Sequence, residues 1–321
     1  MLSEIDRQLL GIFSPHYLEK YDKISDSNGR FVHYTSADAA LKMLQSRTIW
    51  LRNVRLMNDF SEVEHGFYCL RDAYQSRAGE RLRNALDAIT PGVVHEIEDL
   101  FNGWRPHFSK LAYLACVSEH DDSEDRHGRL SMWRAYGGSR SVAIIINPLP
   151  LLAVNDVIHA YASPVMYGDT QTIEHEINRI AANLESVGQM LAGVDRDAVS
   201  GRLFNAFLFA TLCTKHPGFL EEREWRIVYV EKMFSSERLE KSTETINGTP
   251  QFVYKLPIQN IPGEGAERGL FGMDVPELLN RVIIGPSEDG PVIADVFIEL
   301  LVEAGVTDAA ERVVVSGIPL R

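Results

Sequence analysis

Acidic and basic side chains crowd into one stretch of the chain, residues 215–230. Glu222, Glu224 and Arg226 are spaced two apart where a β-branched and aromatic run begins. Because side chains alternate between the two faces of a strand, these three share one face and Trp225 takes the other, with the core. Two carboxylates and a guanidinium are costly to bury unless they pair or do chemistry. The stretch therefore predicts either a carboxylate site or an exposed strand face on which the charges screen each other.

A second group of polar side chains closes a predicted strand over residues 30–36. The strand ends in His33, Tyr34, Thr35 and Ser36. A histidine on a strand is either satisfied within the fold or donates a hydrogen bond to a ligand from a rigid element. Both alternatives stay open on this stretch alone.

A third group follows in a loop and the start of a helix. Asn58 and Asp59 precede Glu62 and His65, and Asp59, Glu62 and His65 are three apart, so they line one helix face. Glu62 and His65 have the Glu-x-x-His spacing of carboxylate-bridged metal bundles, but such a site needs a second copy on another helix. The sequence has no second copy, so we expect no metal; the alternative is a capping Asp59 and a solvated helix face.

A fourth group lies on a predicted short helix over residues 130–136. Trp133 and Tyr136 are three apart and form either a core stripe or a stacking platform, and Arg134 would meet an anion at the helix end. The acidic loop before this helix lacks the glycine and terminal glutamate of an EF-hand. The sequence also lacks a P-loop, a dinucleotide-binding glycine motif, a hydrolase nucleophile elbow and zinc motifs. These absences argue against most common NTPases, hydrolases, dinucleotide-binding folds and zinc proteins.

Composition narrows the class of protein further. The chain has 321 residues, 45% of them hydrophobic, and a net charge of −13, which argues against broad nucleic-acid binding. Its apolar runs are too short for a membrane span, and its charged N-terminus has no signal-peptide pattern. Cys69, Cys116 and Cys213 lie far apart in apolar contexts, as expected in a reducing compartment. We expect a cytoplasmic protein with no membrane partner.

The elements that must position these residues alternate irregularly, which favours an α+β fold with a mixed, mostly antiparallel β core over a doubly wound one. We expect one domain over residues 1–321, in which a helix and connector (1–28) lead into a strand-helix-strand unit (29–58). A helical insertion (59–110) and the remaining sheet with its flanking helices (111–321) follow. Ser36 is a typical N-cap for the first of the inner helices. The polar segment 235–248 is predicted to be an exposed excursion, and 157–167 a strand.

Taken together, these segments resemble a bacterial family known as domain of unknown function 2971. The resemblance covers roughly residues 30–290 and rests on four motifs in order: His33–Ser36 with Ala40, Leu41 and Leu44; Met57–Asp59 with Glu62; Ser131–Tyr136; and Lys215 through Phe219 to Glu222–Arg226.

A more distant resemblance has chemical content. A strand bearing His-x-Thr, then a helix and a short strand, is similar to the opening of ADP-ribosyltransferase-like proteins, which implies a split sheet. It implies that His33 contacts the ribose of NAD and that Glu222 or Glu224, with Glu-x-Glu spacing, stabilises the oxocarbenium-like centre. The aromatic that supports nicotinamide is Tyr136 or Tyr161, and neither lies in a clear motif.

The resemblance implies NAD as substrate and a pocket shared by His33 and Glu224. The anionic pyrophosphate would be held by arginines. The predicted nucleotide-binding residues are His33, Tyr34, Thr35, Ser36, Arg52, Asn58, Asp59, Trp133, Arg134, Tyr136 and Arg226.

Three hypotheses follow for function. The first is an enzyme that cleaves the nicotinamide–ribose bond with His33, Glu224 and Glu222 and transfers ADP-ribose to an acceptor, protein or nucleic acid. The second is a non-catalytic module of a bacterial defence or stress system that binds a nucleotide or a protein. The third, a metal-dependent nuclease using Asp59, Glu62, Glu222 and Glu224, is the weakest because the chain is acidic and lacks the motif. The sequence leaves the acceptor and the oligomeric state open.

Overall fold

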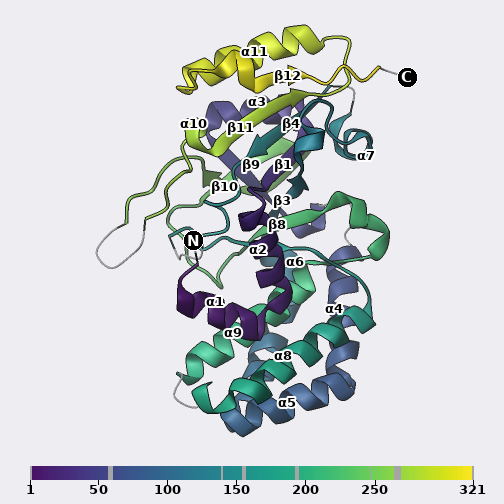
Figure 1. The fold of residues 1–321 in the computed structure, drawn as a ribbon, viewed down its shortest axis with the longest axis vertical. Helices are drawn as coiled ribbons and strands as arrows, with labels where there is room; N and C mark the ends of the chain where they lie inside the picture. The colour runs from purple at the N-terminus through teal and green to yellow at the C-terminus, as the bar shows by residue number, and fades with distance from the viewer. Residues whose placement is uncertain are drawn as a thin grey trace. The chain divides into compact units, whose positions relative to one another are not determined.

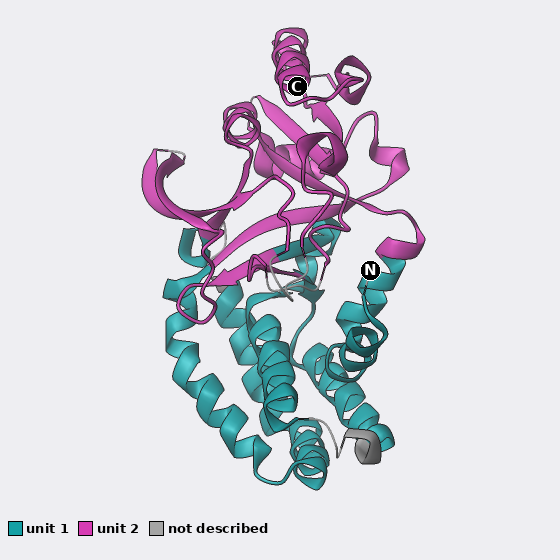
Figure 2. Cartoon of the chain, turned by 90° about the vertical axis from the view of Figure 1, so that its left-hand side faces the viewer, with its two compact units in different colours: residues 1–23, 53–112, 163–226 teal, residues 24–52, 113–162, 227–321 magenta. Residues whose placement is uncertain are grey.

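The structure is a computed structural model that describes residues 2–56, 61–138, 140–153, 157–191, 195–246, 248–263 and 269–319. The chain divides into two compact units, each made of three chain segments (Figure 2). Unit 1 comprises residues 1–23, 53–112 and 163–226, and unit 2 comprises residues 24–52, 113–162 and 227–321. Whether the two units make one domain, as the sequence predicts, stays a prediction.

Unit 2 carries most of a ten-stranded, largely antiparallel open sheet, so the fold is mixed α and β (Figure 1). The strand order is β12-β11-β4-β1-β3-β2-β10-β9, and β8 pairs with β3 and β5. The strands are β1 (Arg30–Ser36), β2 (Thr48–Asn53), β3 (Ala112–His120), β4 (Ser141–Ile146), β5 (Tyr161–Pro164), β8 (Glu224–Val230), β9 (Glu240–Ile246), β10 (Thr249–Pro257), β11 (Leu279–Ile284) and β12 (Val313–Val315). The β11–β12 pair is parallel, whereas the pairs β1–β3, β1–β4, β2–β10, β9–β10 and β4–β11 are antiparallel.

Short helices connect and cover the strands of unit 2. They are α3 (Ala37–Ser46), η2 (Asp122–Glu124), α7 (Leu130–Met132), the π-helix η3 (Trp133–Gly137), α10 (Val275–Leu278), α11 (Gly290–Glu303) and α12 (Ala309–Arg312). The predicted cap is confirmed, because the Ser36 hydroxyl accepts the Ala39 N–H at 3.2 Å at the start of α3. The helix predicted over 130–136 is confirmed in place, but its second half winds as a π-helix, a local irregularity that is frequent at functional sites.

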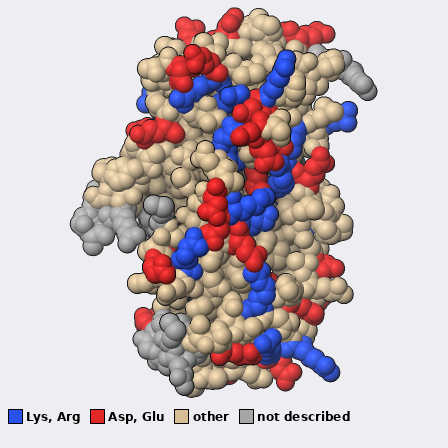
Figure 3. Space-filling view, viewed as in Figure 1, with Lys and Arg blue, Asp and Glu red and all other residues tan. Residues whose placement is uncertain are grey.

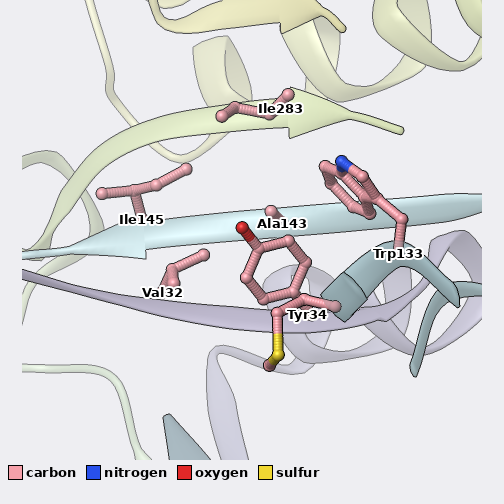
Figure 4. Packing of buried hydrophobic residues seen from close by; sticks show 7 residues of the cluster. Val32, Tyr34, Trp133, Ala143, Ile145 and Ile283 are labelled. Atoms are coloured by element: carbon pink, nitrogen blue, oxygen red, sulfur yellow. The ribbon is translucent and has the colours of Figure 1, made fainter. Parts of the chain in front are cut away.

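A buried apolar cluster lies on one face of the strands β1, β4 and β11 (Figure 4). It consists of Val32, Tyr34, Met132, Trp133, Ala143, Ile145 and Ile283. The rings of Tyr34 and Trp133 meet edge to face with centroids 4.7 Å apart. Trp133 is 3% exposed, and a Cβ at Gly285 would lie 2.9 Å from its ring, so only glycine fits there. This cluster fixes the π-helix against the sheet.

Unit 1 is helical, and its helices hold two short strands. The helices are α1 (Glu4–Phe13), α2 (Pro15–Asp26, most of it), η1 (Val54–Leu56), α4 (Ser61–Gln75), α5 (Arg77–Ile89), α6 (Val93–Leu111), α8 (Thr170–Leu191), α9 (Arg196–Leu212) and η4 (Pro217–Glu222). Strands β6 (Met166–Tyr167) and β7 (Thr214–Lys215) pair in parallel. The helices predicted in this region are confirmed as α4 to α6, with the predicted break before α6, and whether they form an insertion stays a prediction. In the part of the chain that the structure describes, no helix is long and apolar enough to cross a membrane.

Two predictions about strands need correction in part. Residues 235–246 are largely exposed, as predicted, but they contain β9, which pairs with β10 at an edge of the sheet. The side chains of β9 are mostly polar on both faces, so its sequence lacks the alternation of apolar and polar residues that predicts a strand. The strand forms through its pairing with β10. Segment 157–167 is broken into β5 and β6, which belong to different sheets.

Candidate functional site

A close approach of two helices brings the first carboxylate of the site into place. Gly66 of α4 lies against α9, and a Cβ there would be 2.3 Å from the Thr211 carbonyl oxygen. This contact sets α4, which carries Glu62, beside the end of α9. The chain leaves α9 directly into β7, which ends with Lys215. Glu62 and Lys215 consequently form an ion pair of 2.9 Å.

A left-handed residue brings the next two carboxylates to the same ammonium group. Arg223 has φ 47° and ψ 48° and ends η4, with its N–H bonded to the Leu220 carbonyl oxygen. Because this turn separates η4 from β8, Glu222 on η4 and Glu224 on β8 both reach Lys215. The prediction that Glu222, Glu224 and Arg226 share one strand face is therefore wrong for Glu222, which lies before the strand.

Five side chains of unit 1 then form one ion cluster: Glu62, Lys215, Glu222, Glu224 and Arg226. The Lys215 Nζ lies 2.6 Å from Glu222 and 3.2 Å from Glu224. Arg226 donates from Nε to Glu224 at 2.9 Å, from Nη1 to the Leu212 carbonyl oxygen at 2.6 Å, and from Nη2 to Glu62. Three carboxylates thus meet two cations, which leaves the cluster with one net negative charge.

Burial differs among the members of the ion cluster. The side chains of Arg226, Lys215 and Glu224 are 3%, 5% and 5% exposed, whereas those of Glu62 and Glu222 are 11% and 14% exposed. Burial alone would lower the pKa of Lys215, but the charges of Glu224, Glu222 and Glu62 outweigh it and hold that pKa above its usual range. Lys215 therefore stays an ammonium ion and cannot act as a base or a nucleophile at neutral pH.

Tyr167 holds the backbone of the cluster in place. The Tyr167 hydroxyl accepts a hydrogen bond from the N–H of Glu224 at 2.7 Å. Tyr167 also lies opposite Lys215 in the parallel pairing of β6 with β7. Burial raises the pKa of Tyr167, and the charges of Glu224 and Glu222 raise it further. Tyr167 and Lys215 were absent from the predicted site. Tyr167 becomes a neighbour of Lys215 through the β6–β7 pairing, which joins segments nearly 50 residues apart. No local sequence pattern predicts a pairing over that separation.

The chemistry of the ion cluster is that of fixed carboxylates. Their oxygens lie against ammonium and guanidinium groups, which hold the carboxylates in fixed positions. Across the described residues, no group of three or more His, Cys, Asp or Glu side chains is arranged to hold a metal ion. The cluster suits a reaction that develops positive charge close to a carboxylate.

His33 lies in unit 2, on β1, and it is half-buried. Its Nδ1 donates to the Cys116 carbonyl oxygen at 2.8 Å. Burial holds the pKa of His33 below 6.5, opposed by this hydrogen bond and assisted by the Arg52 charge. A neutral ring with the proton on Nδ1 has an acceptor at Nε2. The sequence predicted a donor to a ligand, and this geometry instead makes Nε2 an acceptor.

The other predicted binding residues of unit 2 have varied surroundings. Tyr34 and Trp133 lie in the core, where the Tyr34 hydroxyl accepts the Arg129 N–H at 2.9 Å and the Trp133 Nε1 donates to the His127 carbonyl oxygen at 2.7 Å. Of the two alternatives for Trp133, the core stripe is the one observed. Tyr136 packs half-buried against the same cluster.

The remaining predicted residues are more accessible or not described. Thr35 is half-buried on β1, Arg52 donates from Nε to Gln251 Oε1 at 3.1 Å, and Arg134 is exposed on η3. Asn58 and Asp59 lie outside the described residues. His33 belongs to unit 2 and Glu224 to unit 1, so their shared pocket stays a prediction.

A second charged region, the acidic-loop cluster, lies in unit 2 around residues 119–129. Arg30 pairs with Asp122 at 2.6 Å and with Asp125 at 2.8 Å, and His120 lies 2.9 Å from Asp125. Arg129 pairs with Glu124 at 3.4 Å. On the face drawn in Figure 3, acidic and basic side chains are similarly interspersed.

Comparison with protein-family models gives a match within the chain. Residues 132–227 match the family model described as "Protein of unknown function (DUF2971)", which supports the predicted resemblance over that range. The range includes η3, β7, η4 and the start of β8, with four of the five members of the ion cluster. No curated protein and no solved structure matches the chain. The resemblance to ADP-ribosyltransferase-like proteins stays a prediction.

Proposed function

We propose that the protein cleaves the nicotinamide–ribose bond of NAD and transfers ADP-ribose to an acceptor. The observation that supports this function is the convergence of Glu222 and Glu224 on one buried ammonium group at the start of β8. A glutamate at the start of a late strand is also what the distant sequence resemblance implies for the catalytic carboxylate.

The two glutamates have different roles in this proposal. Glu224 is 5% exposed and both of its oxygens lie against Arg226 and Lys215, so it orients the cations. Glu222 is the more accessible at 14% and faces the ribose. The sequence hypothesis assigned the main catalytic role to Glu224 with Glu222 assisting; the present proposal assigns that role to Glu222, and its greater exposure supports this choice.

The chemistry requires an anion and no cofactor beyond NAD itself. As the bond between ribose C1′ and the nicotinamide nitrogen breaks, its electron pair leaves with nicotinamide, and positive charge develops on the ribose. A fixed Glu222 carboxylate stabilises that charge. The acceptor then supplies a lone pair to C1′ and loses a proton to Glu222. With water as acceptor, the products are ADP-ribose and nicotinamide.

The test is release of free nicotinamide from NAD by the purified full chain. We expect Glu222→Gln to lower the rate at least about 100-fold, the scale of removing one electrostatic group from a transition state. The matched control is Glu221→Gln, the exposed neighbour on the same turn, which should leave the rate within about two-fold. Unfolding curves of both variants confirm that each is folded. A wild-type chain that releases no nicotinamide over hours contradicts the proposal.

A non-catalytic binding module is the second candidate, and the pairing of Glu224 favours it. A carboxylate held by two cations is also what a structural clamp needs. In this case NAD, or another nucleotide, raises the melting temperature of the protein but is recovered intact after incubation. Nicotinamide release that depends on Glu222 excludes this candidate.

A further inference from the structure

Three aromatic rings of unit 2 form a group beside the carboxyl end of β8. The rings of His159 and Phe234 are parallel within 3°, with centroids 6.4 Å apart. Tyr161 meets Phe234 edge to face with centroids 5.4 Å apart, and its hydroxyl lies 3.4 Å from His159 Nδ1. Phe234 follows β8 in the chain, and Tyr161 begins β5, which pairs with β8. All three rings are half-buried, so each keeps accessible surface.

The backbone on both sides of this aromatic group is strained. His159 and Lys232 have φ values of 57° and 70°, a region that side chains with a Cβ rarely adopt. Among the described residues, the other non-glycine positions of this kind are Asn28, Arg47 and Arg223. Arg47 and Arg223 end helices, and asparagine tolerates the conformation. Lys232 lies in the hydrogen-bonded turn after β8, where the Met233 and Phe234 N–H groups donate to the Val230 carbonyl oxygen. The strain that marks this aromatic group is therefore that of His159, and such strain gathers where the surrounding structure supports a ligand site.

A buried hydroxyl lies in the same segment of chain. Ser236, two residues after Phe234, has an Oγ that is buried and has no hydrogen-bond partner in the part of the chain that the structure describes. Lys232, two residues before Phe234, is exposed. A buried polar atom with no partner is costly, which makes a ligand that satisfies it favourable.

We propose that His159, Tyr161 and Phe234 form a stacking site for the planar base of a nucleotide. Aromatic rings stack on any nucleobase because every base has a π face. In this proposal the Ser236 hydroxyl bonds a polar edge of the base and the Lys232 ammonium pairs with a phosphate. The site lies in unit 2 and shares no residue with the ion cluster of unit 1, and the proposal stands without the proposed NAD chemistry.

The test is the affinity of the full chain for adenosine monophosphate, measured by calorimetry. We expect Phe234→Leu, which keeps apolar volume but removes the π face, to weaken binding about ten-fold or more, the scale of losing one stacked ring. Phe252→Leu is the matched control, since Phe252 is 57% exposed on β10 of the same unit, and it should bind as the wild type does. Ser236→Ala should weaken binding several-fold and is an independent variant if Phe234→Leu does not fold.

Ribose 5-phosphate is the control ligand. The proposal is overturned if ribose 5-phosphate binds as tightly as adenosine monophosphate, since the base would then contribute nothing. It is also overturned if the wild type binds no adenosine monophosphate at millimolar concentration, or if Phe234→Leu and Phe252→Leu bind alike.

Discussion

The ion cluster of unit 1 and the acidic-loop cluster of unit 2 use the same residue types in different surroundings. The members of the ion cluster are at most 14% exposed and come from α4, β7, η4 and β8. The acidic-loop cluster gathers around one loop, and its Asp122 side chain is 98% exposed. Charges in the first are all shielded from water and depend on each other, whereas the second combines buried members, such as His120 at 0% and Arg129 at 10%, with the solvated Asp122. Burial, and not the number of ion pairs, therefore decides how much each cluster contributes to stability.

The largest effect is expected from Arg226→Met. This change keeps the length of the side chain but leaves Glu62 and Glu224 without their shared guanidinium. Removing one partner of a buried charge network costs about 3–5 kcal/mol of the free energy of unfolding. Urea unfolding measures this cost, and Arg226→Lys should recover part of it. A loss below about 1 kcal/mol contradicts the view that water is excluded from the cluster.

Sequence patterns predicted the local parts of both clusters and missed the long-range ones. The β1 strand and the Ser36 cap follow from neighbouring residues, and the structure has them where expected. The Glu-x-Glu-x-Arg spacing also identified three members of the ion cluster. The left-handed turn at Arg223 and the β6–β7 pairing that adds Tyr167 depend on contacts between distant segments. Spacing along the chain carries no signal for such contacts.

Two aromatic residues in the core of unit 2 also show where sequence patterns fail to distinguish a site from a core. Tyr34 was predicted to bind a nucleotide because it lies beside His33 at a polar strand end, and Trp133 because it could serve as a stacking platform, with a core stripe as the alternative. In the fold, backbone groups of the acidic-loop region satisfy both polar groups, and the rings fill the core. The sequence of these residues is compatible with rings that stack on a ligand and with rings that pack in the core with their polar groups hydrogen-bonded. Tertiary packing determines which of the two forms.

A matched pair of substitutions measures the effect of burial inside the acidic-loop cluster. Partial burial alone would raise the pKa of Asp125, but hydrogen bonds from His120 and Arg30 outweigh it and hold that pKa below its usual range. Asp125→Asn should therefore lower the free energy of unfolding by about 1–2 kcal/mol. Asp122→Asn removes a carboxylate that pairs with the same Arg30 but is 98% exposed, so its cost should be below about 0.5 kcal/mol. Equal costs in urea unfolding contradict the role assigned to burial.

The smallest predicted effect is a pH dependence that belongs to the acidic-loop cluster. Burial holds the pKa of His120 below 6.5; the Arg30 charge lowers it further, and Asp125 and Glu124 oppose this. Below pH 6.5 the unfolded chain binds a proton at this position that the folded chain resists, so stability falls as the pH falls toward the folded pKa. Unfolding free energies between pH 7 and pH 5 should decline less in His120→Asn than in the wild type. His95→Asn is the control because the His95 side chain is 82% exposed, and its decline should match the wild type. Parallel curves for all three proteins would mean that His120 is solvated in the folded chain. The burial of its ring would then make no difference to the free energy of unfolding relative to the exposed Asp122.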